Sequence, residues 1–371
     1  MKKSGQIAGL VNMIIVAVFL PSVIDIQYNN LPVGLPPHAS ISASLPDLVK
    51  TTPQNASGLA QFAEISFSPW DLVMALAWSP DGKALVVSAG EDVHIYLADG
   101  LTRQVSLKTG AFSHSLAFSP DGRWLAVGSR DGKVRVWDFQ ALLSAQVDLP
   151  PELVLLAHKK GVNSVVFSPN GSYLASGGND AVARLWELGT GRLLQTMIGG
   201  THAVPSIAFP TDGGNLAIIN GNLVRLREVG SGRIAGTFRW TTPLFNLSFS
   251  PDGQTLAVGG NDNQVLLWEA GSAFRTGQEK YPVPIQFTGH NGLTNSYHSL
   301  IWRVVFSPDG LLLASAGGDK TVRIWQVDPP QSIVALREHT AGVTCVAFDP
   351  AGKILISGGL DGKVRFWGVQ K

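Results

Sequence analysis

The sequence predicts an all-β fold, a seven-bladed β-propeller of four-stranded antiparallel blades, preceded by a hydrophobic N-terminal segment and a linker. Three observations support this prediction. A Ser-Pro-Asp-Gly-like marker follows a short apolar strand seven times, the markers recur about every 41 residues, and glycine makes up 41 of the 371 residues. Repeats of this length, with four short strands and many tight turns each, are typical of propeller blades.

Residues 1–27 are predicted to be a signal peptide or signal anchor. Lys2 and Lys3 precede an uncharged run from Ile7 to Leu20, and the first acidic residue is Asp25. A basic head followed by an apolar run of this length is typical of a secretory signal. No A-x-A-like cleavage site follows, so cleavage stays open. Because positive charge is kept in the cytoplasm, we expect the remainder of the chain on the other side of the membrane.

Residues 28–58 are predicted to be a flexible linker. This segment contains five prolines and four serines, carries only Asp47 and Lys50 as charges, and has no sustained hydrophobic period. Such a composition favours an extended, mobile chain over a packed element.

The propeller is predicted to span residues 59–371. In each unit a first strand ends in an aromatic residue, and the marker that follows turns the chain into a second strand. A third strand ends in Trp in five units, and a Gly-containing turn then leads to a fourth strand in several of them. The marker prolines are Pro80, Pro120, Pro169, Pro210, Pro251, Pro308 and Pro350.

The two ends of the repeat region predict how the ring closes. The last unit stops soon after its third strand, at Trp367–Lys371, whereas a surplus strand-like stretch, Ala60–Ser66, precedes the first marker. We expect Ala60–Ser66 to complete the last blade, because the ring then has no open sheet edge.

The units resemble the WD40-repeat family. Trp137-Asp138 is a literal Trp-Asp pair, Gly289-His290 is a literal Gly-His pair, and the resemblance covers Leu59–Lys371. It implies a propeller scaffold in which a His, a Ser, an Asp and a Trp form a hydrogen-bonded network within a blade. Three units carry such a set: His158, Ser176, Asp180 and Trp186; His290, Ser315, Asp319 and Trp325; and His339, Ser357, Asp361 and Trp367.

Ser, His and Asp are also the residues of a hydrolase triad. In this sequence, however, an Asp lies six residues before the aromatic position in five units, whereas an active site would occur once. We therefore interpret these sets as structural networks and expect no catalytic residue. Four units depart from the pattern, with Tyr96, Val127, Arg227 and Val258 in place of Trp or Ser, and we expect their blades to depend more on apolar packing.

The composition excludes several classes of function. The formal net charge is +1, which argues against an electrostatic nucleic-acid binder. The single cysteine, Cys345, excludes an intramolecular disulfide and a cysteine-based zinc site. The remaining histidines have no metal-ligand spacing, and no phosphate-binding glycine loop is present. We expect neither a metal nor a cofactor.

The resemblance also implies which face binds partners. Members of the family commonly use the side chains six and four residues before the marker aromatic and the residue before the network Asp. The face is unusually apolar here, which favours a protein interface, although the alternative is that some of these residues pack between blades. The candidate partner-binding residues are Leu72, Met74, Phe112, His114, Arg130, Phe245, Leu300, Trp302 and Leu360.

The sequence therefore predicts a monomeric, non-enzymatic scaffold that binds a protein or peptide and is membrane-anchored or secreted. One alternative is a propeller enzyme or small-ligand binder that uses the central channel, which would need convergent carboxylates, histidines or a metal. Another is a cytoplasmic scaffold in which the N-terminal segment is a buried helix.

Overall fold

The computed structural model describes residues 46–198, 200–273, 280–292 and 297–371. The predicted signal segment, residues 1–27, and most of the predicted linker lie outside these residues. Within the described ranges, no helix is long and apolar enough to cross a membrane.

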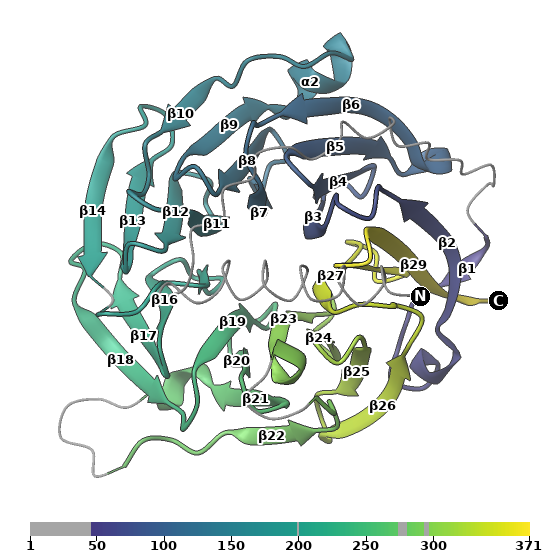
Figure 1. Cartoon of the computed structure of the whole chain (residues 1–371). Coiled ribbons are helices and arrows are strands. Elements are labelled where there is room, and N and C mark those ends of the chain that lie inside the picture. Colours follow the sequence, from purple (N-terminus) through teal and green to yellow (C-terminus); the bar gives the residue numbers. More distant parts are fainter. Residues whose placement is uncertain (1–45, 199, 274–279, 293–296) are drawn as a thin grey trace, which may run out of the picture. The chain divides into compact units, whose positions relative to one another are not determined.

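Seven antiparallel sheets form the fold, as predicted, and Figure 1 shows them arranged around one axis. The first three blades are β3 (Val73–Trp78), β4 (Ala84–Ala89), β5 (Asp92–Leu97) and β6 (Thr102–Lys108); β7 (Ser113–Phe118), β8 (Trp124–Ser129), β9 (Val134–Asp138) and β10 (Leu153–Leu155); and β11 (Val162–Phe167), β12 (Tyr173–Gly178), β13 (Val182–Glu187) and β14 (Leu193–Ile198).

The next three blades are β15 (Ile207–Ala208), β16 (Asn215–Asn220), β17 (Leu223–Glu228) and β18 (Ile234–Arg239); β19 (Leu244–Phe249), β20 (Thr255–Gly260), β21 (Gln264–Glu269) and β22 (Ile285–Thr288); and β23 (Ile301–Phe306), β24 (Leu312–Gly317), β25 (Val322–Gln326) and β26 (Gln331–Leu336). The short helices are α2 (Phe139–Ala145), η1 (Ala56–Gly58), η2 (Asp99–Leu101), η3 (Ala270–Ser272) and η4 (Tyr297–Ser299).

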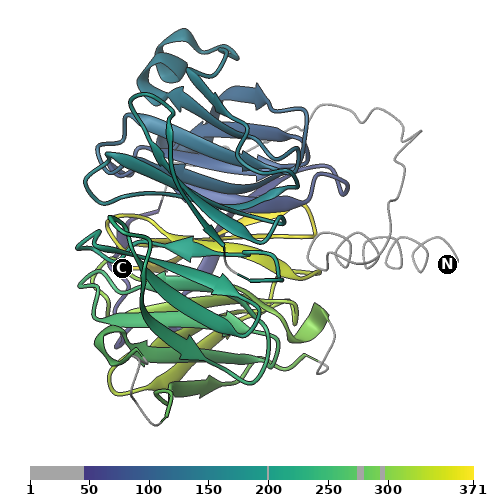
Figure 2. The ribbon, with the colours of Figure 1, turned by 90° about the vertical axis from the view of Figure 1, so that its left-hand side faces the viewer.

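The core lies between neighbouring blades. Each sheet buries both faces, so its central strands are almost wholly apolar rather than alternating; β4, for example, reads Ala-Leu-Val-Val-Ser-Ala and is buried throughout. Between the first two blades, Val105 and Leu107 pack with Leu116 and Leu125 in one cluster. Figure 2 shows the stacked sheets from the side. Burial of apolar surface between sheets therefore joins blade to blade.

The marker sequences form one recurrent turn. In the first blade, the Ser79 hydroxyl donates to Asp81 at 2.6 Å and accepts from the Ala84 backbone N–H at 2.9 Å. Gly82 has a φ of 70°, a left-handed conformation that glycine adopts without steric cost. Ser119, Ser168, Ser250 and Ser307 make the same contacts in their blades. The markers therefore fix the turn between the first and second strands.

The ring closes through β2 (Ala60–Ser66), the stretch that the sequence assigned to the last blade. This blade also holds β27 (Val343–Phe348), β28 (Ile354–Gly359) and β29 (Lys363–Gln370). β2 pairs antiparallel with β29, from Ala60 opposite Gly368 to Ser66 opposite Lys363. Figure 1 shows β2 alongside β29. The closure prediction is confirmed.

The predicted boundary between linker and propeller is wrong. Residues 46–58 were expected to be flexible, but Leu48 and Val49 form β1, which pairs with the end of β29. The Thr51 N–H donates to the Gly352 carbonyl at 2.8 Å, and Lys50 pairs with Asp309 of the sixth blade at 2.8 Å. Leu48 and Ala56 are buried in the core. The proline and serine content of the segment gave no sign of these few apolar side chains, and among the described residues the folded part already includes β1.

The strap formed by residues 46–58 and the strand β2 should contribute separately to stability. A chain that begins at Leu59 should lose about 2 kcal/mol of unfolding free energy relative to one that begins at Pro46, because buried Leu48 is removed. A chain that begins at Pro69 also lacks β2 and should aggregate through the exposed edge of β29. Urea unfolding and light scattering measure these effects; equal behaviour of all three chains would contradict this account of closure.

Candidate functional site

The innermost strands of six blades share a β-bulge near their first residue. In β3, for example, Val73 pairs with Ala89 and Ala75 with Ser88, which leaves Met74 without a partner in the ladder. A bulge bends the strand and redirects the side chain of the extra residue. The bulged residues are Met74, His114, Asn163, Phe245, Trp302 and Thr344, all four positions before the marker aromatic.

A backbone hydrogen bond joins each bulged strand to the turn between the second and third strands. The Arg130 N–H donates to the Phe112 carbonyl at 2.8 Å, and the Leu360 N–H donates to the Gly342 carbonyl at 2.9 Å. The same bond links Leu72 with Gly90, Gly161 with Asn179, Pro243 with Asn261, and Leu300 with Gly318. The two groups of candidate positions therefore lie on one face of the ring, which we call the bulge face.

Four of the nine candidate partner-binding residues are packed rather than available on the surface. Leu72, Leu300, Trp302 and Leu360 are each less than 9% exposed, and Trp302 and Leu360 both approach the small Gly342. These four side chains pack between neighbouring blades, the alternative given above for some of the candidates, and leave little of their surface for a partner to contact.

The other five candidates remain accessible. Met74, Phe112, His114 and Phe245 are half-buried, and Arg130 is exposed. Burial between the innermost strands, together with the nearby charge of Arg130, lowers the pKa of His114 to about 4. The His114 imidazole is therefore neutral at pH 7.

A set of small polar side chains next to the bulges links consecutive blades, and these side chains were not among the predicted site residues. The Ser115 hydroxyl accepts from the Val165 N–H of the next blade at 3.0 Å, and Asn246 accepts from the Val304 N–H at 2.9 Å. Ser164 and Ser206 make equivalent bonds, to Ile207 and Leu247 respectively. These bonds satisfy N–H groups on the first strands of the third, fourth, fifth and sixth blades. The signal was a small polar residue three positions before the marker aromatic in four consecutive units.

The third blade brings its predicted network together. Trp186 Nε1 donates to Ser176 Oγ at 3.0 Å, and Ser176 Oγ lies 2.9 Å from His158 Nε2. His158 Nδ1 lies 2.6 Å from Asp180, which also accepts from Arg184 at 2.9 Å. Burial lowers the pKa of His158 despite the opposing effect of Asp180. Neutral His158 then donates through Nδ1 and accepts through Nε2 from the Ser176 hydroxyl.

The sixth and seventh blades repeat this geometry. In the sixth, Ser315 Oγ lies 2.7 Å from His290 Nε2 and accepts from Trp325 Nε1 at 2.8 Å, while His290 Nδ1 lies 2.9 Å from Asp319. Although burial alone would raise the pKa of Asp319, hydrogen bonds from His290, Asn291 and Thr321 outweigh it and lower that pKa.

In the seventh blade, Ser357 Oγ lies 2.8 Å from His339 Nε2 and accepts from Trp367 Nε1 at 2.9 Å. His339 Nδ1 lies 3.0 Å from Asp361.

These networks have the connectivity of a hydrolase triad but cannot reach a substrate. Ser176, Ser315 and Ser357 are 0% exposed, and each hydroxyl oxygen is capped by an indole N–H. Their polar atoms satisfy one another inside the blades, as buried polar groups usually do. Within the described ranges, no cluster of three or more His, Cys, Asp or Glu side chains could hold a metal ion.

Three of the four blades that lack a full network satisfy the side chain at the aromatic position with backbone carbonyls, whereas the Tyr96 hydroxyl of the first blade has no hydrogen-bond partner among the described residues. Without a serine partner, Trp137 Nε1 donates to the Leu149 carbonyl at 2.8 Å and Trp268 Nε1 to the Pro282 carbonyl at 3.0 Å. Arg227 in the fourth blade donates to the carbonyls of Gly232 and Ile198. Tyr96 is fully buried, and burial raises its pKa to about 12. Backbone carbonyls thus replace the serine in three of these blades.

Replacing Ser176 with Ala should lower the unfolding free energy by about 1–3 kcal/mol, because Trp186 and His158 would lose a shared buried partner. The exposed Ser172 of the same blade is the control, and Ser172→Ala should change stability little. Chemical denaturation measures both variants. A fluorophosphonate probe should label none of the three network serines, and labelling of any would show that a reactive serine is present.

Comparison with known proteins agrees with this geometry. The "WD domain, G-beta repeat" profile matches residues 108–138, 150–187, 233–269, 284–326 and 330–368, about half of the chain. The chain is similar to cell division cycle 20.1, cofactor of APC complex, from Arabidopsis thaliana, with 32% identity over 256 residues, 66% of this chain and 43% of that protein.

The chain is also similar to target of rapamycin complex subunit wat1 from Schizosaccharomyces pombe, with 24% identity over 271 residues, 72% of this chain and 65% of that protein. The small ribosomal subunit protein RACK1y from Oryza sativa is 41% identical over 83 residues, 22% of this chain and 24% of that protein. The matches span less than two thirds of each of these relatives. On its repeats, its seven blades and the profile match, the chain belongs to the WD40-repeat family.

Proposed function

We propose that this protein is a non-enzymatic scaffold that holds a protein or peptide partner on its bulge face. The observation that carries the proposal is the group of accessible apolar side chains at the bulges and beside them. Met74, Phe112 and Phe245 are half-buried, so each has a fixed position while part of its surface stays free. Aromatic and Met side chains are enriched in the cores of protein interfaces.

The backbone beneath these side chains is well fixed. Backbone hydrogen bonds tie each bulged strand to the turn between the second and third strands of its blade. Side-chain hydrogen bonds tie several of these strands to the next blade, and their acceptors are Ser115, Ser164, Ser206 and Asn246. A site whose backbone is already ordered loses less conformational entropy on binding, which favours affinity. The nearly balanced charge of the chain favours a protein over a nucleic acid as the partner.

The printed names of three relatives support a role in larger assemblies. They describe a cofactor of one complex, a subunit of a second complex and a protein of the small ribosomal subunit. For this chain, the proposal is that it too is one component of a protein assembly.

We further propose that residues 1–27 anchor the protein in a membrane or direct its secretion, with the propeller outside the cytoplasm. The support is the sequence alone: Lys2 and Lys3 ahead of an uncharged apolar run. Residues 28–45 would then connect this segment to the strap that begins at Pro46.

The bulge face can be tested by comparing two apolar side chains on opposite faces. Phe245→Ala should weaken partner binding by about 2 kcal/mol, as loss of an interface anchor does. Leu311, 52% exposed in a marker turn on the other face, is the matched control, and Leu311→Ala should leave binding unchanged. A partner is first isolated from the producing cells by affinity purification on the full chain and identified by mass spectrometry. It is then titrated against each purified variant, with thermal melting to verify folding.

A photo-crosslinking residue at each position gives a second measurement. Crosslinks should form from position 245 and not from position 311. Equal weakening by both alanine variants, or crosslinks from position 311 alone, would place the interface away from the bulge face.

The location can be tested by fractionation of two chains in the cells that produce the protein. The full chain should appear in the membrane fraction or the medium, and a chain that begins at Pro46 should remain in the soluble cell fraction. The physical reason is that the apolar run is the feature that targets the chain to a membrane. Identical distribution of both chains would favour the cytoplasmic alternative.

A further inference from the structure

A pocket of about 620 Å³ lies between the second and third blades, on the face opposite the bulge face. Its walls come from the turns that join first to second strands, at Trp124 and Ser172, and from the connections between third and fourth strands, at Leu153 and Leu188. Neither the predicted partner site nor the polar networks include these residues.

The pocket exists because the second blade has an unusual fourth strand. β10 is three residues long, and residues 139–152 precede it as α2 and an irregular segment. Asp138 caps α2 by accepting from the Ala141 N–H at 3.1 Å. The chain then returns so that Glu152 and Leu153 face the turn at Gly189 of the third blade.

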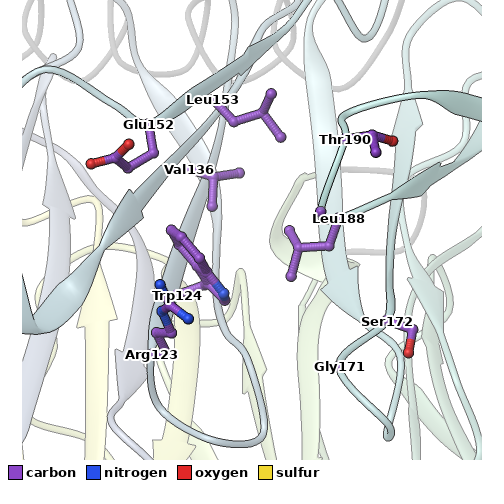
Figure 3. A pocket seen from close by; sticks show the side chains of 10 residues that line it. Arg123, Trp124, Val136, Glu152, Leu153, Gly171, Ser172, Leu188 and Thr190 are labelled. Carbon is purple, nitrogen blue, oxygen red and sulfur yellow. The ribbon is translucent and has the colours of Figure 1, made fainter.

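Apolar side chains form opposite walls of the pocket. Figure 3 shows Leu153, Val136 and Trp124 on one side and Leu188 on the other, with Thr190 above and Ser172 below Leu188 on its side. A volume in the range of ordinary ligand sites exceeds one side chain and can take two or three residues of a peptide.

The charges at the pocket leave one carboxylate uncompensated. The Arg123 guanidinium lies over the Trp124 ring at 4.6 Å and pairs with Asp138 at 3.3 Å, so its charge is already balanced. The exposed Glu152 has no ion pair or hydrogen bond to any described residue. These two are the charged residues that line the pocket. The pocket therefore combines apolar side chains on two walls with a net negative rim.

We propose that this pocket is a second docking site, for a peptide segment that carries a basic residue beside an apolar one. The apolar side chain fills the space between Leu153 and Leu188, and the cation pairs with Glu152. This complementarity of charge favours a basic segment over a neutral or acidic one. The site is independent of the bulge face, so a scaffold could hold two segments on opposite faces at once.

The test uses the full chain and three rhodamine-labelled peptides, acetylated and amidated, with cores Leu-Arg-Leu, Leu-Gln-Leu and Leu-Glu-Leu. Fluorescence anisotropy should give the arginine peptide an affinity about three- to fivefold above the glutamine peptide, the gain that one exposed ion pair provides. Added salt should reduce this preference, because it screens exposed charges. Equal affinities, or a preference for the glutamate peptide, would overturn the proposal.

Glu152→Gln should remove the preference for arginine, whereas Glu269→Gln should retain it. Glu269 is an exposed glutamate at the end of the third strand of the fifth blade and serves as the matched control. Retention of the preference in Glu152→Gln, or its loss in Glu269→Gln, would show that Glu152 does not recognise the cation.

A second pair of variants tests the volume of the pocket without disturbing the fold. A Cβ atom added at Gly189 meets no atom within 4 Å, and the same is true of Gly230, the equivalent turn residue of the fourth blade. Gly189→Leu should therefore fold normally and weaken binding of the arginine peptide several-fold, while Gly230→Leu should not. Unchanged binding in Gly189→Leu would place the peptide outside the pocket.

Discussion

Backbone pairing between β2 and β29 joins the beginning and the end of the repeat region, and closure of the ring of blades depends on this pairing. Without this pairing, the outer side of β29 would be an open sheet edge, which is prone to association with other chains. Side chains reinforce the pairing: Lys363 and Arg365 of β29 both bind Glu64 of β2, and Arg365 also donates to Gln61. The strap at residues 46–58 then fastens the sixth and seventh blades together on the face opposite the bulge face.

The remaining order follows from packing between blades. Because both faces of each sheet are buried, a polar atom inside a blade needs a partner within that blade or in the next one. Ser176, His158, Asp180 and Trp186 satisfy one another, whereas Trp137 uses a carbonyl of the segment that leads to β10. The same segment also lines the pocket, through Glu152. The segment that accepts the hydrogen bond from Trp137 is therefore also part of the proposed second docking site.

The fold could be predicted from the sequence almost completely, because the period of the markers and the surplus strand Ala60–Ser66 are local signals. The profile match leaves out nearly all of the first blade and the first three strands of the fourth, where Tyr96 and Arg227 replace Trp, yet both blades form. The candidate site was predicted less well. Trp302 and Phe245 occupy the same position in their repeats, so the sequence pattern predicts the same role for both. Packing against neighbouring blades buries the Trp302 side chain but leaves Phe245 accessible, and the pattern does not contain this difference. The strap and the pocket arise from nonlocal contacts that carry no repeat signal.

Closure by the N-terminal strand also has a consequence for how the protein folds during synthesis. Glu64 precedes its partner Lys363 by 299 residues, so β2 leaves the ribosome long before the strand it pairs with exists. Contacts of such high sequence separation form late and slow folding. Through most of translation β2 is therefore an unpaired segment, while the earlier blades can already fold. During this interval the nascent protein is most prone to associate wrongly with other chains.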